Sequence, residues 1–501
     1  LPTLESPVYS HPIQVHDRKD DPNDISMITT ISYGFVEPVG NVNKIITIRA
    51  RSINNLTKTQ SPVVTHSYLV GQNIYDRYSL PIISLIMEPE DLFNKERGIY
   101  VTGRGPEDAA RDGDNYFFWP ANYHERGQDW ERPVFVEHFD IDGSVRVSQN
   151  AGIRIHGGAS RSYRQKSFRL YADIKYDELH QLNDSYFPNL FETTVSNPGI
   201  EYQTLILRNS GTDFFSAFMR DVVTQRLVAH THVETQAIQP VIHSLNGEYW
   251  GIYFLYERFD EGYFHTYYAI SPQNLIVTEH VGNVNIGVIK DQESYQNLLN
   301  FVHTQDIKNE AIYEEIEKQI DIDNFIDYQI IEIYIANQDW PLTNVKFWKS
   351  RVPTDDSGIA FEHDGKWRWL LFDTDDGFNK ADLNAMIYAT REDLPTDLLR
   401  NLLKNAEFQI QFLNRFADHL NSTFLTDRVI QEIDDVQAML EPEMQEQINR
   451  WHSSGSSMEN WRENVAFLRS FAIRRPEIIT QHQVEYFDLD GTFLLALSTN
   501  P

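Results

Sequence analysis

The sequence feature that most constrains the fold is a change of hydrophobic periodicity near residue 260. Over residues 146–257, several short runs carry apolar side chains at every second position, which is typical of β-strands. Over residues 261–482, the apolar side chains recur at every third or fourth position, as they do on one face of an α-helix. The chain is therefore predicted to have an α+β fold, with a β-rich N-lobe at 146–270 and a helical C-lobe at 271–485. A cleft between two such lobes would suit a small-molecule ligand.

Two hairpins are predicted within the β-rich part of the chain. Asn246-Gly247 separates two strand-like runs, and this dipeptide favours a tight two-residue turn. A second hairpin is expected around the turn at 140–143. A two-strand insert at 345–372 is expected to interrupt the helical lobe, which otherwise includes helices such as 261–268 and 322–336.

The rest of the chain is expected to form further segments, because 501 residues are too many for one hydrophobic core. Residues 1–70 show short alternating runs punctuated by Pro, Asn and Gly, which predict a small β-sandwich. Residues 71–145 read as connecting strands and a long loop that pack on the following lobe. Residues 486–501 read as the start of another β segment.

Composition excludes several classes of function. The formal net charge of −30 disfavours binding to nucleic acid, because phosphate backbones would be repelled. The absence of cysteine rules out disulfides, thiolate nucleophiles and cysteine zinc sites in this sequence. No apolar run is long enough to predict a membrane span. Because the chain begins as if in mid-domain, we expect a secretion signal to have been removed and the protein to be extracellular or on the cell surface.

The stretch from 337 to 379 carries the residues of a candidate metal site. An apolar strand at 366–372 leads directly into Asp373-Thr374-Asp375-Asp376. Closely spaced carboxylates at the end of a strand are suited to a hard divalent cation. Asp339 and Asn344, which precede the insert, could add a base and another ligand, as phosphoryl transfer requires. The alternative reading of the same residues is a solvated acidic turn.

A second candidate site lies in a small-residue loop of the β-rich part. The loop 157–161, Gly-Gly-Ala-Ser-Arg, is followed by a strand that begins near Lys166. Glycines let backbone N–H groups approach a phosphate, and a lysine adds a positive charge. Period two places Lys166 on the same face as two apolar residues, whereas Arg169, the rival candidate, lies on the other face. Asp221 either pairs with the lysine or is simply an acid at a helix start.

These motifs, in this order and spacing, resemble the CotH family of atypical, spore-coat-type protein kinases. The resemblance is carried by the loop 157–161 with Lys166-Ser167-Phe168-Arg169-Leu170, by Arg220-Asp221, by 245–253 with Glu257, by Asp339 with Asn344, and by Phe372-Asp373-Thr374-Asp375. It covers about 146–485 and is closest to the large multidomain bacterial branch. In that branch the kinase region is preceded by a module similar to the chitobiase C-terminal or fibronectin III sandwich. Here that module would be residues 1–70.

The resemblance implies a divergent protein-kinase-like, two-lobed fold and a role for each matched residue. Asp339 would be the catalytic aspartate, and Asn344, Asp373 and Asp375 would bind the metal. Lys166 would be the catalytic nucleotide lysine. The nucleotide-binding set would be Gly158, Ser160, Arg161, Lys166, Asp221 and Glu257. The usual glycine-rich G-x-G-x-x-G loop is absent, and 157–160 stands in its place.

The implied reaction is transfer of the γ-phosphoryl group of ATP to Ser or Thr of an extracellular protein, with Mg²⁺ or Mn²⁺ and with Ca²⁺ as a further candidate. Three alternatives remain open from the residues themselves. One is a catalytically inactive kinase-fold scaffold that binds nucleotide, calcium or carbohydrate. Another is a protein that binds carbohydrate or cell-surface matrix and holds structural calcium. The third is a hydrolase that uses Asp339 and Asp373 as an acid/base pair.

Overall fold

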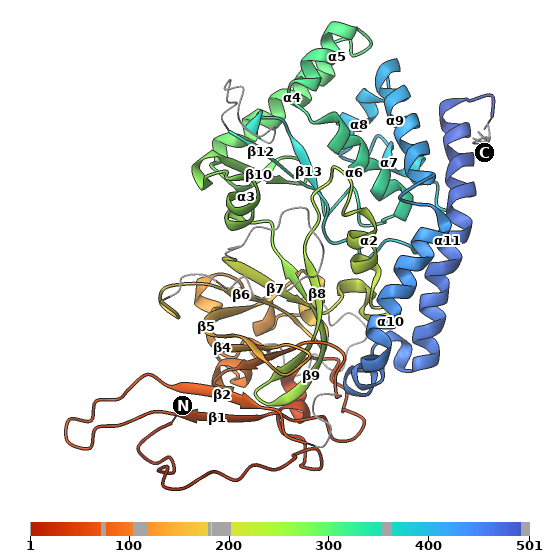
Figure 1. The fold of residues 1–501 in the computed structure, drawn as a ribbon. Coiled ribbons are helices and arrows are strands. Elements are labelled where there is room, and N and C mark those ends of the chain that lie inside the picture. The colour runs from red at the N-terminus through yellow and green to blue at the C-terminus, as the bar shows by residue number, and fades with distance from the viewer. Residues whose placement is uncertain are drawn as a thin grey trace, which may run out of the picture. The chain divides into compact units, whose positions relative to one another are not determined.

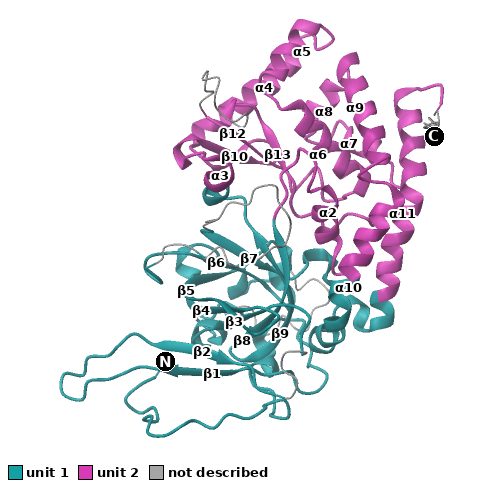
Figure 2. Cartoon of the chain, in the orientation of Figure 1, with its two compact units in different colours: residues 1–216, 237–263, 438–461 teal, residues 217–236, 264–437, 462–501 magenta. Residues whose placement is uncertain are grey.

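The computed structural model describes residues 2–71, 77–103, 119–178, 182, 202–351 and 363–491. It combines helices with several sheets, so the α+β class is confirmed. Two compact units share the chain (Figure 2). Unit 1 comprises residues 1–216, 237–263 and 438–461, and unit 2 comprises residues 217–236, 264–437 and 462–501. Each unit is described by itself below.

Unit 1 is built around a closed seven-stranded β-barrel. Its strand order is β3-β4-β5-β6-β7-β9-β8 (Figure 1). Six of the seven pairings are antiparallel, and β3 closes the barrel by pairing in parallel with β8. The strands are β3 (Ile82–Ile86), β4 (Arg132–Phe139), β5 (Val145–His156), β6 (Ser167–Tyr171), β7 (Thr204–Arg208), β8 (Ile238–Leu245) and β9 (Glu248–Glu257).

Local turn chemistry explains the two hairpins of the barrel. Asn246 and Gly247 have φ values of 46° and 85°, the left-handed conformations that a two-residue hairpin turn requires. A side chain at Gly247 would also meet the carbonyl oxygen of Ile45 at 2.6 Å, so glycine is needed there for space as well. The hairpin at 140–143 joins β4 to β5. Both predicted hairpins are therefore present.

The N-terminal segments differ from the expectation. The described part of residues 1–70 has one two-stranded sheet, β1 (Ile46–Ala50) with β2 (Val64–Tyr68), in place of the two packed sheets of a sandwich. Residues 25–31 belong to the range expected to form short strands, but they form two 3₁₀ turns, and the backbone N–H groups of Asp24 and Ser26 donate to the Glu248 carboxylate of the barrel. Residues 71–145, expected to form connecting strands and a long loop, do contain strands, and these strands, β3 and β4, are part of the barrel itself.

Unit 2 contains a four-stranded sheet and most of the helices. The sheet order is β11-β10-β12-β13, with β10 (Leu275–Glu279), β11 (Asn283–Ile286), β12 (Lys346–Ser350) and β13 (Arg368–Leu370). The predicted two-strand insert is thus β12 and β13, whereas β10 and β11 were missed because they are short apolar or mixed runs. The helices lying wholly in this unit are α2 (Arg220–Val228), α4 (Gln292–Thr304), α5 (Glu310–Glu317), α6 (Ile322–Ile335), α7 (Ala385–Ala389), α8 (Asp397–Leu402) and α9 (Ala406–Leu420).

Three further helices have residues in both units. They are α3 (Glu261–Tyr268), α10 (Thr426–Trp451) and α11 (Met458–Phe487), and α1 (Pro89–Phe93) belongs to unit 1. Helix α11 continues to Phe487, so residues 486 and 487 are helical and not the start of a β segment; residues 492–501 lie outside the described residues. None of the described helices has the length and apolarity needed to cross a membrane.

Candidate functional site

The acidic turn after β13 is held in place by a buried threonine. The side-chain hydroxyl and the backbone N–H of Thr374 both donate to Oδ1 of Asp221, at 2.7 and 3.0 Å. Asp221 lies in the first turn of α2, and both residues are buried. Asp373 adopts a left-handed backbone with φ of 61°, a conformation that aspartate tolerates better than most residues. The turn is therefore fixed between its two candidate metal ligands, Asp373 and Asp375.

The loop after α6 brings Asp339 and Asn344 to the same region. The Asn337 amide donates to Glu332 Oε2 at 2.9 Å, and its oxygen accepts from the Asp339 N–H at 3.2 Å. At the end of this loop, the Asn344 amide donates to the backbone carbonyl of Asp373 at 3.2 Å. Asn344 also has a left-handed backbone, with φ of 58°. Left-handed residues other than glycine cluster at functional sites, because their strain needs compensation by the surrounding structure.

Mutual repulsion among carboxylates marks this region. Burial raises the pKa of Glu332 to about 8, and the charges of Asp221 and Asp373 add to the rise. The carboxyl of Asp339 is partly desolvated although the residue reaches solvent, and this desolvation and the charge of Asp373 raise its pKa. The pKa of Asp376 is raised by burial and then by Asp339. Crowded acids of this kind favour a bound cation, because a cation relieves their repulsion.

The donor set is compatible with magnesium. Within the described ranges, no three His, Asp or Glu side chains converge closely enough to form a preformed metal cage. Mg²⁺ is commonly held by one or two carboxylates, with waters and substrate phosphates completing its shell. Asp373 and the amide of Asn344 lie together, and Asp375 is buried two residues further on. These residues therefore fit a magnesium ion that takes some of its ligands from the protein and the others from water and a phosphate.

The predicted phosphate loop, residues 157–161, lies in unit 1. One part of it is open to solvent, and another part is held by hydrogen bonds to backbone carbonyls. Gly158 is exposed, and a side chain there would meet no atom within 4 Å, so its backbone is open to a ligand. Ser160 is half-buried in the 3₁₀ turn Ala159–Ser162. Arg161 is buried and donates to the carbonyls of Gly157, Tyr123 and Glu125. Its contacts are those of a residue that shapes the loop.

Lys166 is fully buried at the start of β6. Its ammonium donates to the carbonyl of Tyr163 at 2.7 Å and lies 3.9 Å from the centre of the Tyr123 ring. No carboxylate of the described residues pairs with it, and burial holds the pKa of Lys166 well below its usual value. The inward direction expected from the strand pattern is confirmed. The role of this lysine toward nucleotide stays a prediction.

The opposite face of the same strand carries a group of basic side chains. His156 on β5, Arg169 on β6, Arg208 on β7 and Arg258 just after β9 belong to neighbouring barrel strands. Arg169 lies 2.8 Å from Nδ1 of His156, and its Nε has no hydrogen-bond partner among the described residues. Burial, followed by the charges of Arg169, Arg208 and Arg258, lowers the pKa of His156. We call these four residues the basic face.

The remaining predicted residue, Glu257, is buried at the end of β9 opposite Leu205 of β7. For Asp221, pairing with Lys166 and a place at a helix start were the two alternatives; it lies in the first turn of α2 and accepts hydrogen bonds from Thr374. Unit 2 therefore brings together Asp221, Asp339, Asn344 and Asp373, whereas Gly158, Ser160, Arg161, Lys166 and Glu257 belong to unit 1.

Sequence reasoning missed several residues of both groups. Glu332 is the only charged residue in the run Ile330-Ile331-Glu332-Ile333-Tyr334, and this lone acid in an apolar stretch was an available signal. Asn337 and Thr374 carried no comparable signal, because their importance lies in hydrogen bonds to distant segments. Of the basic face, only Arg169 was named, as the rival of Lys166, and its other members were hidden because they come from separate strands.

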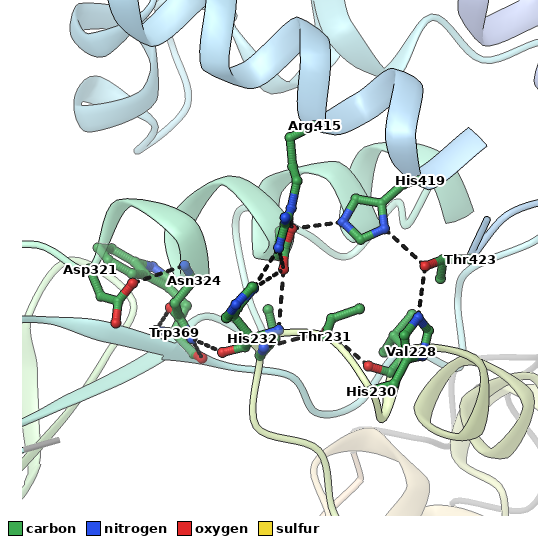
Figure 3. A network of polar contacts seen from close by, with 12 residues as sticks. Val228, His230, Thr231, His232, Asp321, Asn324, Trp369, Arg415, His419 and Thr423 are labelled. Atoms are coloured by element: carbon green, nitrogen blue, oxygen red, sulfur yellow. Dashed lines mark hydrogen bonds and ion pairs between the residues drawn. The ribbon is translucent and has the colours of Figure 1, made fainter. Parts of the chain in front are cut away.

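A polar network anchors α6, the helix that leads into the Asp339 loop (Figure 3). Asp327 of α6 is fully buried and accepts hydrogen bonds from Arg415 Nε at 2.7 Å and His419 Nε2 at 2.7 Å, both from α9. Figure 3 labels Arg415, His419 and His232 of this network. Nδ1 of His232, from the segment after α2, lies 3.0 Å from the other oxygen of Asp327. One carboxylate thus links three segments of unit 2.

The comparisons with known proteins agree with the motif order. A search of curated proteins found no match. The family described as CotH kinase protein matches residues 153–479, which is more than half of the chain. That range begins in β5 and ends in α11, and it includes the acidic turn, the Asp339 loop and the basic face. The chain therefore belongs to the CotH kinase family.

Proposed function

We propose that this protein transfers the γ-phosphoryl group of ATP to Ser or Thr of an extracellular or cell-surface protein, with Mg²⁺ or Mn²⁺ as the metal. Membership of the CotH kinase family supports a kinase-like function. The observation that carries the specific reaction is the contact of the Asn344 amide with Asp373, which joins the Asp339 loop to the acidic turn. A base and metal ligands held together are the parts that phosphoryl transfer needs.

In this proposal Asp339 accepts the proton of the substrate hydroxyl. Its carboxyl reaches solvent, and its raised pKa improves it as a proton acceptor. Its backbone carbonyl accepts two hydrogen bonds at 3.0 Å from the N–H and the hydroxyl of Thr343, which fix the loop. Asp373, Asp375 and Asn344 would hold the metal, whose charge would neutralise the phosphate oxygens.

Within unit 1, the basic face is the group of side chains that best fits an anionic ligand such as the phosphates of a nucleotide. Arg169 is half-buried, lies near other cations, and has a donor with no partner among the described residues. An arginine fork of this kind matches phosphate geometry. The carboxylate of Asp260 lies 3.6 Å from Arg258, while Arg154 on the same strand as His156 is paired with Glu131. The open donor of Arg169, beside other cations, favours an anionic ligand.

The test is transfer of labelled phosphate from ATP by purified protein with Mg²⁺ or Mn²⁺. We expect incorporation by the wild type and its loss in Asp339→Ala and in Asp375→Ala, with both variants still folded. The proposed reaction is wrong if the wild type and both variants incorporate equally, or if the folded wild type incorporates nothing with either metal across candidate protein substrates.

A second candidate is a kinase-fold scaffold that binds nucleotide without transferring phosphate. One observation favours it: Lys166, the nucleotide lysine implied by the family resemblance, is fully buried and hydrogen-bonded to a backbone carbonyl. Binding of ATP with metal, measured as a rise in unfolding temperature, in a protein that never transfers phosphate would favour this candidate.

A further inference from the structure

A cavity of about 420 Å³ lies in unit 1, beside the first strands of the barrel. Its described walls come from β2, β3, β4, the hairpin at 140–145 and residues 69, 78 and 80 between β2 and β3. The volume is in the range of small-molecule sites. The lining includes Tyr68, Tyr78 and Phe139, together with the carboxylates of Glu137 and Asp140.

The buried carboxylate of Glu137 is the chemically distinctive group. Glu137 is only 1% exposed. Its Oε2 accepts the Ser67 N–H at 2.7 Å, and its Oε1 lies 3.3 Å from Nδ1 of the half-exposed His66. Within the described ranges, no Lys or Arg pairs with it. A carboxylate has about four acceptor positions, so these two contacts leave room for more donors.

The charged side chains that line the cavity favour a positively charged ligand. Asp140 also lines the cavity, but it is paired with Arg146, whereas Glu137 has no such arginine. An anion would meet two carboxylates, and a neutral ligand would leave the buried charge of Glu137 poorly compensated. A cation with an apolar body would satisfy both the carboxylate and the aromatic walls.

The mouth of the cavity suits an alkyl chain. Tyr68, Ile141 and Val145 line it and are 44%, 52% and 53% exposed, so they present apolar surface to solvent. The strongly negative net charge of the chain also favours approach of a cation.

We propose that this cavity binds an alkylammonium ion, from a free amine or from a lysine side chain of another protein. The ammonium pairs with Glu137, and the alkyl chain lies against Tyr68, Tyr78 and Phe139. This inference does not rest on the proposed kinase activity.

The test is a ligand-detected NMR titration of the full chain with pentylammonium and with its neutral analogue 1-pentanol. We expect saturable binding of pentylammonium and at least tenfold weaker binding of 1-pentanol. Glu137→Gln should weaken pentylammonium by about ten- to hundredfold, the usual worth of a hydrogen bond to a charged group. The control Glu37→Gln, at an exposed glutamate outside the cavity, should change nothing.

A second pair of variants covers the case in which Glu137→Gln fails to fold. Tyr68 is partly exposed, so Tyr68→Ala should weaken binding while leaving the fold intact, and Tyr68→Phe should retain it. A titration with a lysine blocked at both ends identifies the source: tighter binding than pentylammonium indicates a protein side chain, and weaker binding a free amine. The proposal is overturned if 1-pentanol binds equally well, if folded Glu137→Gln or Tyr68→Ala keeps full affinity, or if pentylammonium does not bind.

Discussion

Oδ1 of Asp221 accepts both the hydroxyl and the backbone N–H of Thr374, so a residue of α2 fixes the turn that carries Asp373 and Asp375. The turn is therefore positioned by a residue more than a hundred positions earlier in the chain. This relationship gives Asp221 a positioning role within unit 2.

Replacing Asp221 should disturb the acidic turn. We expect Asp221→Ala to lower unfolding stability by about 1–3 kcal/mol, because two buried donors lose their acceptor. Metal affinity should fall with it, whereas Asp221→Asn, which keeps one acceptor oxygen, should retain more of both. Denaturant unfolding and Mn²⁺ titration measure these effects. Unchanged metal affinity in a folded Asp221→Ala would contradict the positioning role.

The two faces of β6 should differ in their effect on nucleotide binding. We expect Arg169→Met to weaken ATP binding at least tenfold, because a phosphate loses a charged donor. Lys166→Met, a change of similar length at a buried position, should alter ATP affinity less than threefold and affect mainly stability. Calorimetric titration of both variants with ATP and Mg²⁺ measures the two affinities. The reverse pattern would return the phosphate role to Lys166.

Glu332 should make the protein less stable as the pH rises. Its pKa is about 8 in the folded chain and near 4.5 when unfolded, so the unfolded state loses its proton first. The folded state is then disfavoured by about 1.4 kcal/mol per pH unit between those two values. Glu332→Gln, which stays neutral, should match the wild type near pH 4.5 and exceed its stability at pH 8. Equal stabilities at both pH values would contradict the raised pKa.

The network around Asp327 should make a large contribution to stability. Hydrogen bonds from Arg415, His232 and His419 outweigh burial and hold the pKa of Asp327 far below its usual value. This contribution is present above the ordinary aspartate pKa and is lost as the pH falls through the lowered one. Asp327→Asn should therefore cost about 3–5 kcal/mol at neutral pH, as for a broken buried ion pair. A loss below 1 kcal/mol would contradict it.

His232 provides a matched test with the opposite pH dependence. Its hydrogen bond to Asp327 raises its pKa, so its contribution is complete below the unfolded value near 6.5 and is lost as the pH rises through the folded value. The stability difference between wild type and His232→Gln should therefore shrink from pH 6 to pH 9. A difference that grows over this range would refute the assignment.

Local sequence patterns predicted much of the fold, but they did not predict that the strands of unit 1 close into a barrel. The hairpin at Asn246-Gly247 and the helix at Glu261–Tyr268 follow from turn chemistry and periodicity, and both are present. The parallel pairing of β3 with β8 joins residues 82–85 to 242–245 and has no local signal, so the barrel was not foreseen. The same limit applies to residues 25–31, where a distant glutamate, Glu248, accepts the backbone N–H groups of Asp24 and Ser26.

The candidate site shows the same division. Asp339, Asn344 and Asp373 were visible as acids and amides near a strand end, and the structure brings them together in unit 2. Period two correctly directed Lys166 inward, but it could not reveal that the outward Arg169 lies among three other basic residues. Such groups form only when several strands lie side by side.

The central claim is that Asp339 acts in transfer and not in holding the nucleotide. The most direct measurement is single-turnover phosphate transfer by Asp339→Asn, alongside its affinity for ATP with Mn²⁺. We expect affinity within about threefold of wild type and transfer slower by about 10²–10⁴-fold, the usual contribution of a positioned base. Transfer at the wild-type rate by folded Asp339→Asn would contradict the account.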